Sequence, residues 1–173
     1  MKYLVTGGAG FIGSHMCDAL IKRGDSVIVL DNLSTGSKKN IKHLESNANF
    51  ELVEGSVLNH GILDKLTSSV EFVIHLAAAV GVFNIVNNSL ASLKVNLRGT
   101  ENVLTSSNEF NRPILIASTS EIYGKNTNVP LSEESDRVIG SPLKSRWTYS
   151  EAKAIDESLA YFYHLENSLD VRI

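Results

Sequence analysis

The feature that most constrains this chain is a strand, a glycine-rich turn and a helix at its very beginning. The apolar run from Tyr3 to Val5 predicts a buried strand, and residues 15–23 predict a helix. Between them, four of the seven residues from Gly7 to Gly13 are glycine. Glycines allow a tight turn, and the start of a helix offers free N–H groups and partial positive charge to an anion. The stretch therefore predicts the phosphate-binding turn of a dinucleotide site.

Two glycine spacings fit this turn: a G-x-G-x-x-G pattern that starts at Gly8, and a G-x-x-G-x-x-G pattern that starts at Gly7. The motif alone also describes a plain structural turn, because glycine turns between strands and helices are common. The candidate cofactor contacts of this turn are Gly7, Gly10, Phe11, Ile12 and Gly13.

The composition is that of one soluble globular domain covering residues 1–173, with 43% hydrophobic and 20% charged residues. The net charge of −3 and the lack of a basic block argue against a nucleic-acid partner. No apolar run is long enough to span a membrane, and the N-terminus does not resemble a signal peptide. The single cysteine, Cys17, is expected to be a buried, reduced thiol, which fits the cytoplasm. No metal site is expected.

Predicted strands and helices alternate along the rest of the chain. Strands are expected at residues 26–30, 50–53, 71–76, 113–117 and 170–173, and helices at 59–66, 88–108 and 147–167. This alternation predicts an α/β fold, a Rossmann-like doubly wound parallel sheet with helices on both faces. Residues 125–146 are expected to form a long loop, and loops of that length are usually functional.

Ligands of such sheets bind at the carboxyl ends of the strands. Asp31 ends the second strand, 18 residues after Gly13, where a nucleotide fold places the acid that binds the adenosine ribose. A carboxylate there repels the extra phosphate of NADP and so favours NAD; the alternative is an ordinary turn acid. The loop that follows carries the further candidates Asn32, Ser34, Thr35 and Gly36, and two other strand ends carry Ala77, Ala78 and Ser118.

Two polar residues have alternative interpretations. His75 lies in a buried strand among apolar neighbours, which favours a core histidine over a catalytic one. Asn96 lies in the middle of the longest predicted helix, and it is either an exposed residue or one that reaches into the cofactor cleft.

Tyr149 and Lys153 lie four residues apart and share one face of the last helix. A neighbouring ammonium and the positive end of a helix should both lower the pKa of the phenol, so that it can remove a proton from an alcohol. A hydroxyl of Thr119 or Ser120 could hold the same alcohol oxygen. The Tyr-x-x-x-Lys pair is common on surface helices, and its position after five strands of a nucleotide fold gives it meaning.

Together these motifs resemble the extended short-chain dehydrogenases/reductases of the NAD-dependent epimerase/dehydratase family. The matching stretches are residues 6–13, 31–36, 75–78, 96–100, 118–124 and 149–153. The resemblance implies tightly held NAD and a nucleotide-diphosphate sugar, UDP-linked, that is transiently oxidised. It implies Tyr149 as base, Lys153 as its electrostatic partner and nicotinamide-ribose ligand, and Thr119 at the family's catalytic Ser/Thr position. The catalytic set it implies is Thr119, Ser120, Glu121, Tyr149 and Lys153. The further cofactor contacts it implies are Ser56, Val57, Leu76, Asn96 and Ala117.

The resemblance implies an epimerase first, with a decarboxylase of UDP-glucuronate as the alternative. Thr119-Ser120-Glu121 resembles those decarboxylases, whereas dehydratases of the family have aspartate where this chain has Ser120. Ser56 and Val80 replace an aspartate and a lysine that are frequent in the family.

Because the family's substrate-binding part normally follows the sixth strand, the chain is expected to be an N-terminal part that lacks it. A dinucleotide-binding module without catalysis and an NADP-linked reductase are the remaining alternatives. A homodimer formed through the helices at 88–108 and 147–167 is a further expectation from the resemblance.

Overall fold

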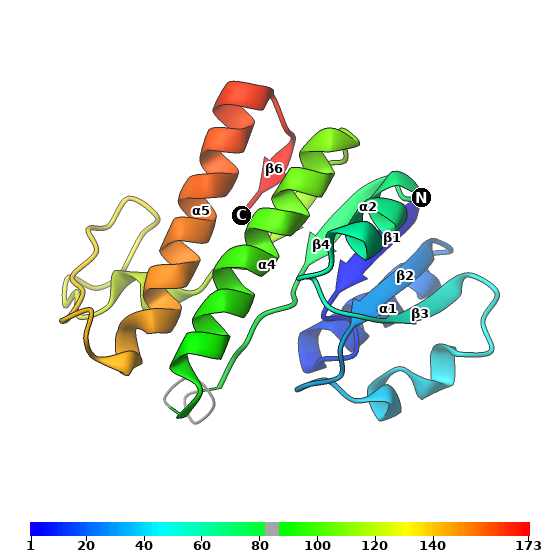
Figure 1. Cartoon of the computed structure of the whole chain (residues 1–173), viewed down its shortest axis with the longest axis horizontal. Helices are drawn as coiled ribbons and strands as arrows, with labels where there is room; N and C mark the ends of the chain where they lie inside the picture. Colours follow the sequence, from blue (N-terminus) through cyan, green and yellow to red (C-terminus); the bar gives the residue numbers. More distant parts are fainter. Residues whose placement is uncertain (82–86) are drawn as a thin grey trace.

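The computed structural model describes residues 1–81 and 87–173 (Figure 1). Its described strands form a parallel sheet in the order β3-β2-β1-β4-β5-β6, the order of the Rossmann fold. The strands are β1 (Lys2–Thr6), β2 (Ser26–Asp31), β3 (Phe50–Glu54), β4 (Phe72–His75), β5 (Ile114–Ile116) and β6 (Val171–Arg172). The expected α/β class and doubly wound sheet are confirmed.

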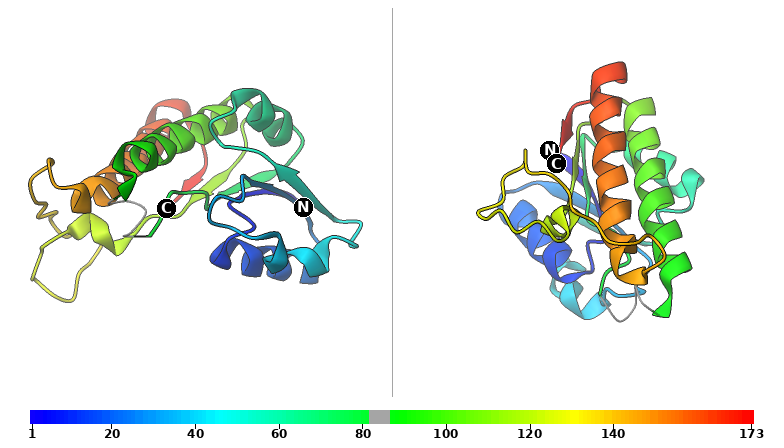
Figure 2. Two further views of the ribbon diagram at one scale, coloured as in Figure 1. Left: turned by 60° about the horizontal axis from the view of Figure 1, so that its bottom comes forward. Right: turned by 90° about the vertical axis from the view of Figure 1, so that its left-hand side faces the viewer.

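The α-helices cover both faces of this sheet, as Figure 2 shows. They are α1 (Phe11–Lys22), α2 (His60–Ser68), α4 (Ser89–Glu109) and α5 (Thr148–Asn167). α1 lies on one face, and α2, α4 and α5 lie on the other, where α4 and α5 run side by side. None of the helices in the described ranges is long and apolar enough to cross a membrane.

The central strands are continuous apolar runs because both of their faces are covered. Leu4 of β1 packs into the core under α2, α4 and α5, whereas its neighbour Val5 packs into the core under α1. This alternation follows from the two-residue period of a strand. The order of the strands reverses between β1 and β4, and a ligand crevice is expected at that point.

One boundary differs from the expectation in an informative way. α1 starts at Phe11, before the residues 15–23 predicted from the apolar pattern, because Gly10 is its N-cap and Gly13 lies inside the helix. The strand exit after β5 turns directly into a short 3-10 helix, η3 (Ser120–Tyr123). The long loop is confirmed: between Gly124 and the next 3-10 helix, η4 (Ser145–Trp147), its regular pairing is one bridge from Gly124 to Val138.

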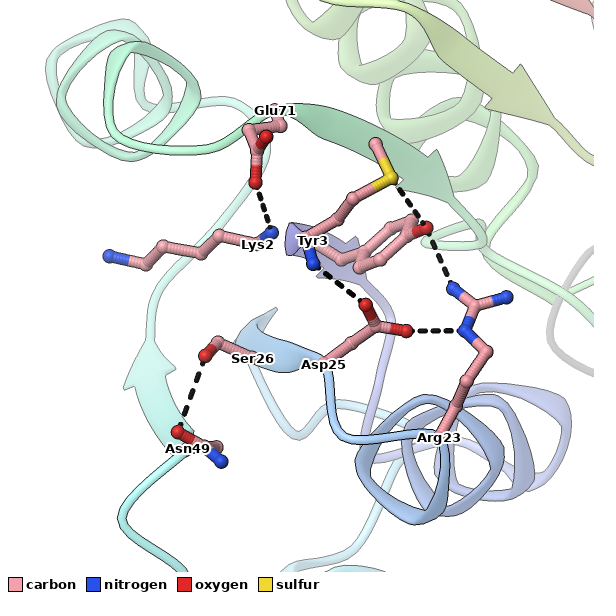
Figure 3. Close-up of polar contacts among 8 residues, drawn as sticks. Lys2, Tyr3, Arg23, Asp25, Ser26, Asn49 and Glu71 are labelled. Atoms are coloured by element: carbon pink, nitrogen blue, oxygen red, sulfur yellow. Dashed lines mark hydrogen bonds and ion pairs between the residues drawn. The ribbon is translucent and has the colours of Figure 1, made fainter.

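The amino terminus is fixed by polar contacts at the amino-terminal ends of β1 and β2 (Figure 3), opposite the carboxyl end of β1 that leads into the glycine turn. The N-terminal ammonium lies 2.8 Å from Oδ1 of Asp25, and Arg23 donates to the other carboxylate oxygen at 2.5 Å. Arg23 also donates to the hydroxyl of Tyr3 at 2.7 Å. These contacts fix the start of β1, and therefore the strand that leads into the turn.

Candidate functional site

A cavity of about 810 Å³ opens at the carboxyl ends of β1, β2, β4 and β5. The structure brings together in its lining every predicted cofactor contact except Asn96. These are Gly7, Gly10, Phe11, Ile12, Gly13, Asp31, Asn32, Ser34, Thr35, Gly36, Ser56, Val57, Leu76, Ala77, Ala78, Ala117, Ser118, Tyr149 and Lys153. The size and the position at the switch point of the sheet suit a dinucleotide.

The glycine turn lines one end of the cavity, and its geometry distinguishes the two spacings. Gly7, Gly10 and Gly13 line the cavity, whereas Gly8 packs against Val29. Gly7 has a φ of +72°, and a Cβ there would meet the backbone of Ala77 at 2.7 Å. A Cβ on Gly13 would lie 2.2 Å from the carbonyl oxygen of Gly7. The operative pattern is therefore G-x-x-G-x-x-G, because glycine lets the turn, α1 and the exit of β4 approach closely.

The first turn of α1 faces the cavity with exposed side chains, since Phe11 is 79% and Ile12 65% exposed. Gly10 caps the helix without a side-chain hydrogen bond, and no acidic residue lies in the first turn. The backbone N–H groups there have no partner within the helix. They give this end of the cavity a partial positive charge.

Asp31 is buried at the end of β2 and holds the surrounding loops together. Its Oδ2 accepts from the backbone N–H of Ala9 at 2.9 Å, and its Oδ1 accepts from that of Leu33 at 2.8 Å. The carboxylate therefore ties the glycine turn to the loop after β2, a structural role that the motif did not predict. Each oxygen of a carboxylate has a second lone pair, so the side chain can still accept from a ligand.

Asn96 corrects both interpretations offered for it. It is buried, with 2% of its surface exposed, and it is not part of the cavity lining. Its Oδ1 accepts from the N–H of Ala79 at 2.7 Å, and its Nδ2 donates to the carbonyl of the same residue at 3.2 Å. Asn96 thus acts on the cavity indirectly, by fixing the backbone that leaves β4.

Several lining residues were not among the predicted cofactor contacts. They are Leu30, Gly55, Ala79, Val80, Asn88, Ala91, Ser92 and Val95. The signal that could have revealed the last three is the run of small residues on one face of α4, which lets the helix approach the cavity. Leu30, Gly55 and Ala79 adjoin predicted contacts in sequence, and the strand-end argument extends to them.

His75 is a core histidine, as the sequence indicated. Its Nδ1 lies 2.7 Å from Oγ1 of Thr6, and its Nε2 lies 3.1 Å from Oγ1 of Thr100. Burial, with a smaller effect from the charge of Lys153, lowers its pKa to about 3, so the ring is neutral. Cys17 is likewise buried, and burial raises the pKa of its thiol to about 12, which makes it unreactive.

Tyr149 and Lys153 lie in the first turns of α5 and line the same cavity as the glycine turn. The expected lowering of the phenol pKa is wrong for this structure. The pKa of Tyr149 is raised, first by burial and then by the negative charges of Glu121 and Asp156. Lys153 is buried, and its Nζ lies 3.3 Å from Oδ2 of Asp156, so its charge is shared with a carboxylate that the motif does not include.

The strand-exit residues lie beside the cavity, and their side chains bond to protein groups nearby. Thr119 accepts from the N–H of Glu121 through its hydroxyl and so caps η3. The carboxylate of Glu121 pairs with Arg146 at 2.6 Å. Ser120 is exposed, and Ser118 donates to the carboxylate of Glu157. Of the residues at 118–121, only Ser118 lines the cavity.

The fold and the site define a Rossmann-type dinucleotide-binding domain with a Tyr-x-x-x-Lys pair in the same cavity lining as its glycine turn. Residues 4–173 match the family model described as GDP-mannose 4,6 dehydratase, and the chain belongs to that family. The membership in the NAD-dependent epimerase/dehydratase family expected from the sequence is thereby confirmed.

Three known proteins illustrate the range of the family. The UDP-N-acetyl-alpha-D-glucosaminuronate decarboxylase of Bacillus cytotoxicus is 39% identical over 165 residues, which are 95% of this chain and 50% of that protein. The UDP-glucose 4-epimerase of Thermotoga maritima, solved with UDP-glucose, is 34% identical with a TM-score of 0.85, over 98% of this chain and 53% of that one.

The dTDP-glucose 4,6-dehydratase of Streptomyces venezuelae, solved with NAD bound, is 30% identical with a TM-score of 0.91, over 100% of this chain and 54% of that one. The chain thus spans about half the length of the relatives it matches.

Proposed function

We propose that this chain is the cofactor-binding part of an NAD-dependent enzyme that transiently oxidises a nucleotide-diphosphate sugar. The observation that carries the proposal is the shared cavity. Its lining contains both the glycine turn and the Tyr149 and Lys153 pair. NAD, when bound, supplies the acceptor for a hydride from the sugar. A crystal structure of a relative with NAD bound supports this cofactor.

The lining residues fit NAD in type and position. The pyrophosphate would lie on the turn formed by Gly7, Gly10 and Gly13, at the start of α1. Asp31 would accept from the adenosine ribose hydroxyls, and its charge would disfavour the additional phosphate of NADP. The remaining contacts with the adenosine would come from Asn32, Ser34, Thr35, Gly36, Ser56 and Val57. Those with the nicotinamide half would come from Leu76, Ala77, Ala78, Ala117, Ser118 and Lys153.

Tyr149 is the proposed base that takes the proton of the sugar alcohol. Its raised pKa means that the phenol is protonated in the isolated chain. Ionisation therefore requires more positive charge at the phenol, which Lys153 and an oxidised nicotinamide would provide. Thr119, with Ser120 and Glu121 beside it, would hold the sugar oxygen after a local rearrangement, because these residues lie next to the cavity lining.

Among the activities of the family, we propose decarboxylation of a UDP-linked sugar acid. Two observations favour it over the epimerase that the sequence alone put first. Thr119-Ser120-Glu121 is the decarboxylase-like sequence, and a relative at 39% identity is a UDP-N-acetyl-alpha-D-glucosaminuronate decarboxylase. Epimerisation stays the second candidate, supported by the solved epimerase at 34% identity.

The test is to incubate the natural full-length protein and NAD with UDP-glucuronate, UDP-N-acetylglucosaminuronate and UDP-glucose. Carbon dioxide would be followed by gas detection and the sugar products by NMR. Release of carbon dioxide from a UDP-uronate supports decarboxylation, and a changed stereocentre without carbon dioxide supports epimerisation. No turnover of any nucleotide sugar would contradict both. NAD binding without turnover would favour a non-catalytic binding module, and tighter binding of NADP than of NAD would favour the reductase.

A homodimer through α4 and α5 is also proposed. α5 exposes four large apolar side chains, those of Ile155, Tyr161, Phe162 and Leu165, by 46%, 54%, 53% and 56%. Burial of such side chains against a second copy would be favourable. Sedimentation of the protein and of Phe162→Glu tests it, with a monomer expected for the variant only; an unchanged mass would contradict this interface.

A further inference from the structure

A buried carboxylate lies behind the cavity, where the proposed mechanism gives it no role. Asp156 follows Lys153 by three residues on α5, and its side chain is 2% exposed. Lys153 belongs to the cavity lining and Asp156 does not. The carboxylate contacts the lining through the Lys153 ammonium, with 3.3 Å between Oδ2 and Nζ.

A row of polar side chains continues from Asp156 through the core to the glycine turn. Thr100 on α4 is close enough to lower the pKa of the carboxylate, although no hydrogen bond of good geometry joins the two side chains. Oγ1 of Thr100 lies 3.1 Å from Nε2 of His75, and Nδ1 of that ring lies 2.7 Å from Oγ1 of Thr6. Thr6 immediately precedes Gly7 and also accepts from the N–H of Ala77 at 3.2 Å.

The hydrogen bonds of this row have one consistent direction. The ring of His75 is neutral, so one nitrogen donates and the other accepts. With Nε2 protonated, the ring donates to Oγ1 of Thr100 and Nδ1 accepts from the hydroxyl of Thr6, and the hydroxyl proton of Thr100 is then available on the side of Asp156. We assign this tautomer because it directs every hydroxyl proton of the row toward the carboxylate.

Asp156 is nevertheless incompletely satisfied. Neither carboxylate oxygen has a hydrogen-bond partner of good geometry among residues 1–81 and 87–173. Burial raises the pKa of Asp156 to about 6, against the opposing effects of Lys153 and Thr100, and the charge of Glu157 adds to the rise. The carboxylate is therefore ionised at neutral pH and depends on Lys153 for its main compensation.

The charged and titratable groups around it come from three elements. α5 contributes Lys153, Glu157 and the phenol of Tyr149, whose pKa the charge of Asp156 helps to raise. α4 contributes the hydroxyl of Thr100, and β4 contributes the neutral ring of His75, which contacts that hydroxyl. Lys153 is the cation among these groups, so the carboxylate of Asp156 and the phenol of Tyr149 compete for its positive charge.

We propose that Asp156 is a positioning residue. Its carboxylate holds the Lys153 ammonium in place and thereby weakens the effect of that positive charge on the pKa of Tyr149. The proposal rests on the proposed function only in treating Tyr149 and Lys153 as the reactive pair. Thr100, His75 and Thr6 lie in a row between Asp156 and the glycine turn, and they link the catalytic end of the cavity to the turn that would carry the phosphates.

The test is Asp156→Asn, which keeps the shape of the side chain and removes its charge. The ionisation of Tyr149 would be followed by ultraviolet absorbance, with the signal isolated by subtracting Tyr149→Phe in each background. We expect the titration midpoint of Tyr149 to fall by roughly one pH unit, because a like charge is removed and the ammonium is released. A crystal structure of the variant should show the Lys153 ammonium displaced from position 156.

The matched control is Glu166→Gln, the same change of charge at an exposed position of the same helix, which should leave the titration unchanged. If Asp156→Asn does not fold, Asp156→Ala replaces it in the same comparison. A folded variant in which the Tyr149 midpoint stays the same, or in which the ammonium keeps its place, would overturn the proposal. Neither readout needs NAD or a sugar, so this result is separable from a failure of the proposed function.

Discussion

Replacing Gly13 by alanine separates the role of the glycine turn from ordinary helix propensity. Gly13 lies inside α1, where alanine would normally add up to about 1 kcal/mol of stability. Its added methyl group, however, would lie 2.2 Å from the carbonyl oxygen of Gly7 and 2.7 Å from the Cα of Gly8. Both obstacles are backbone atoms of the turn, so the helix and the turn must move apart by more than 1 Å to restore about 3.5 Å contacts.

The cost of this movement outweighs the gain in propensity. Overpacking costs about 1–3 kcal/mol, and the contact with rigid backbone puts Gly13→Ala near the upper value. After the propensity gain, the free energy of unfolding should fall by about 2 kcal/mol, which lowers Tm by roughly 4–8 °C for a domain of this size. Because the displaced atoms belong to the proposed phosphate-binding turn, the affinity for NAD should fall at least about tenfold, or 1.4 kcal/mol.

Thermal unfolding and calorimetric titration with NAD measure the two effects. Gly61→Ala in α2 is the matched control, because the nearest atom to its new Cβ would be 3.6 Å away. That variant should gain about 0.5–1 kcal/mol and bind NAD normally. The reasoning would be refuted if Gly13→Ala were as stable as Gly61→Ala, or if it bound NAD as tightly as the parent protein.

Three further predictions follow from the site. Tyr149→Phe in the full-length protein should keep NAD binding and lose about two to four orders of magnitude in turnover; unchanged turnover would exclude Tyr149 as the base. Asp31→Asn should narrow the preference for NAD over NADP in competition titrations, and an unchanged ratio would contradict the ribose role. His75→Gln should alter the pH dependence of stability: the unfolded chain binds a proton between the ordinary pKa of 6.5 and the native value of about 3, so His75 destabilises the native protein as the pH falls. The pKa of Asp156, raised from 3.8 to about 6, opposes this effect, because the native protein then binds a proton that the unfolded chain does not. Denaturant titrations of His75→Gln between pH 6 and 4 should therefore show a smaller loss of stability on acidification, by up to about 1.4 kcal/mol per pH unit. An unchanged slope of stability against pH would show that His75 does not titrate in this way.

The architecture and most of the cavity were predictable from the sequence because they depend on local patterns. The glycine turn after β1, the acid Asp31 at the end of β2 and the small residues Ala77 and Ala78 after β4 each belong to a strand end. Parallel strands bring those ends together. Once the alternation of strands and helices was recognised, their convergence needed no further information.

What the sequence did not predict depends on contacts between distant elements. Asn96 turned out to clamp the backbone of Ala79, and nothing in its own helix indicates that partner. The predicted direction of the pKa shift of Tyr149 was wrong, because an argument from the helical spacing to Lys153 takes no account of burial or of the competing carboxylate of Asp156. The hydrogen bonds that Asp31 accepts from the N–H groups of Ala9 and Leu33 likewise follow only from the folded turn.

The central claim is that one cavity holds NAD between the glycine turn and the Tyr149 and Lys153 pair. A crystal structure of the protein with NAD tests it most directly. We predict the pyrophosphate on the backbone of Gly7, Gly10 and Gly13, the adenosine ribose on Asp31, and the nicotinamide beside Tyr149. A nucleotide bound with its nicotinamide outside the reach of Tyr149, or bound away from the glycine turn, would contradict the account.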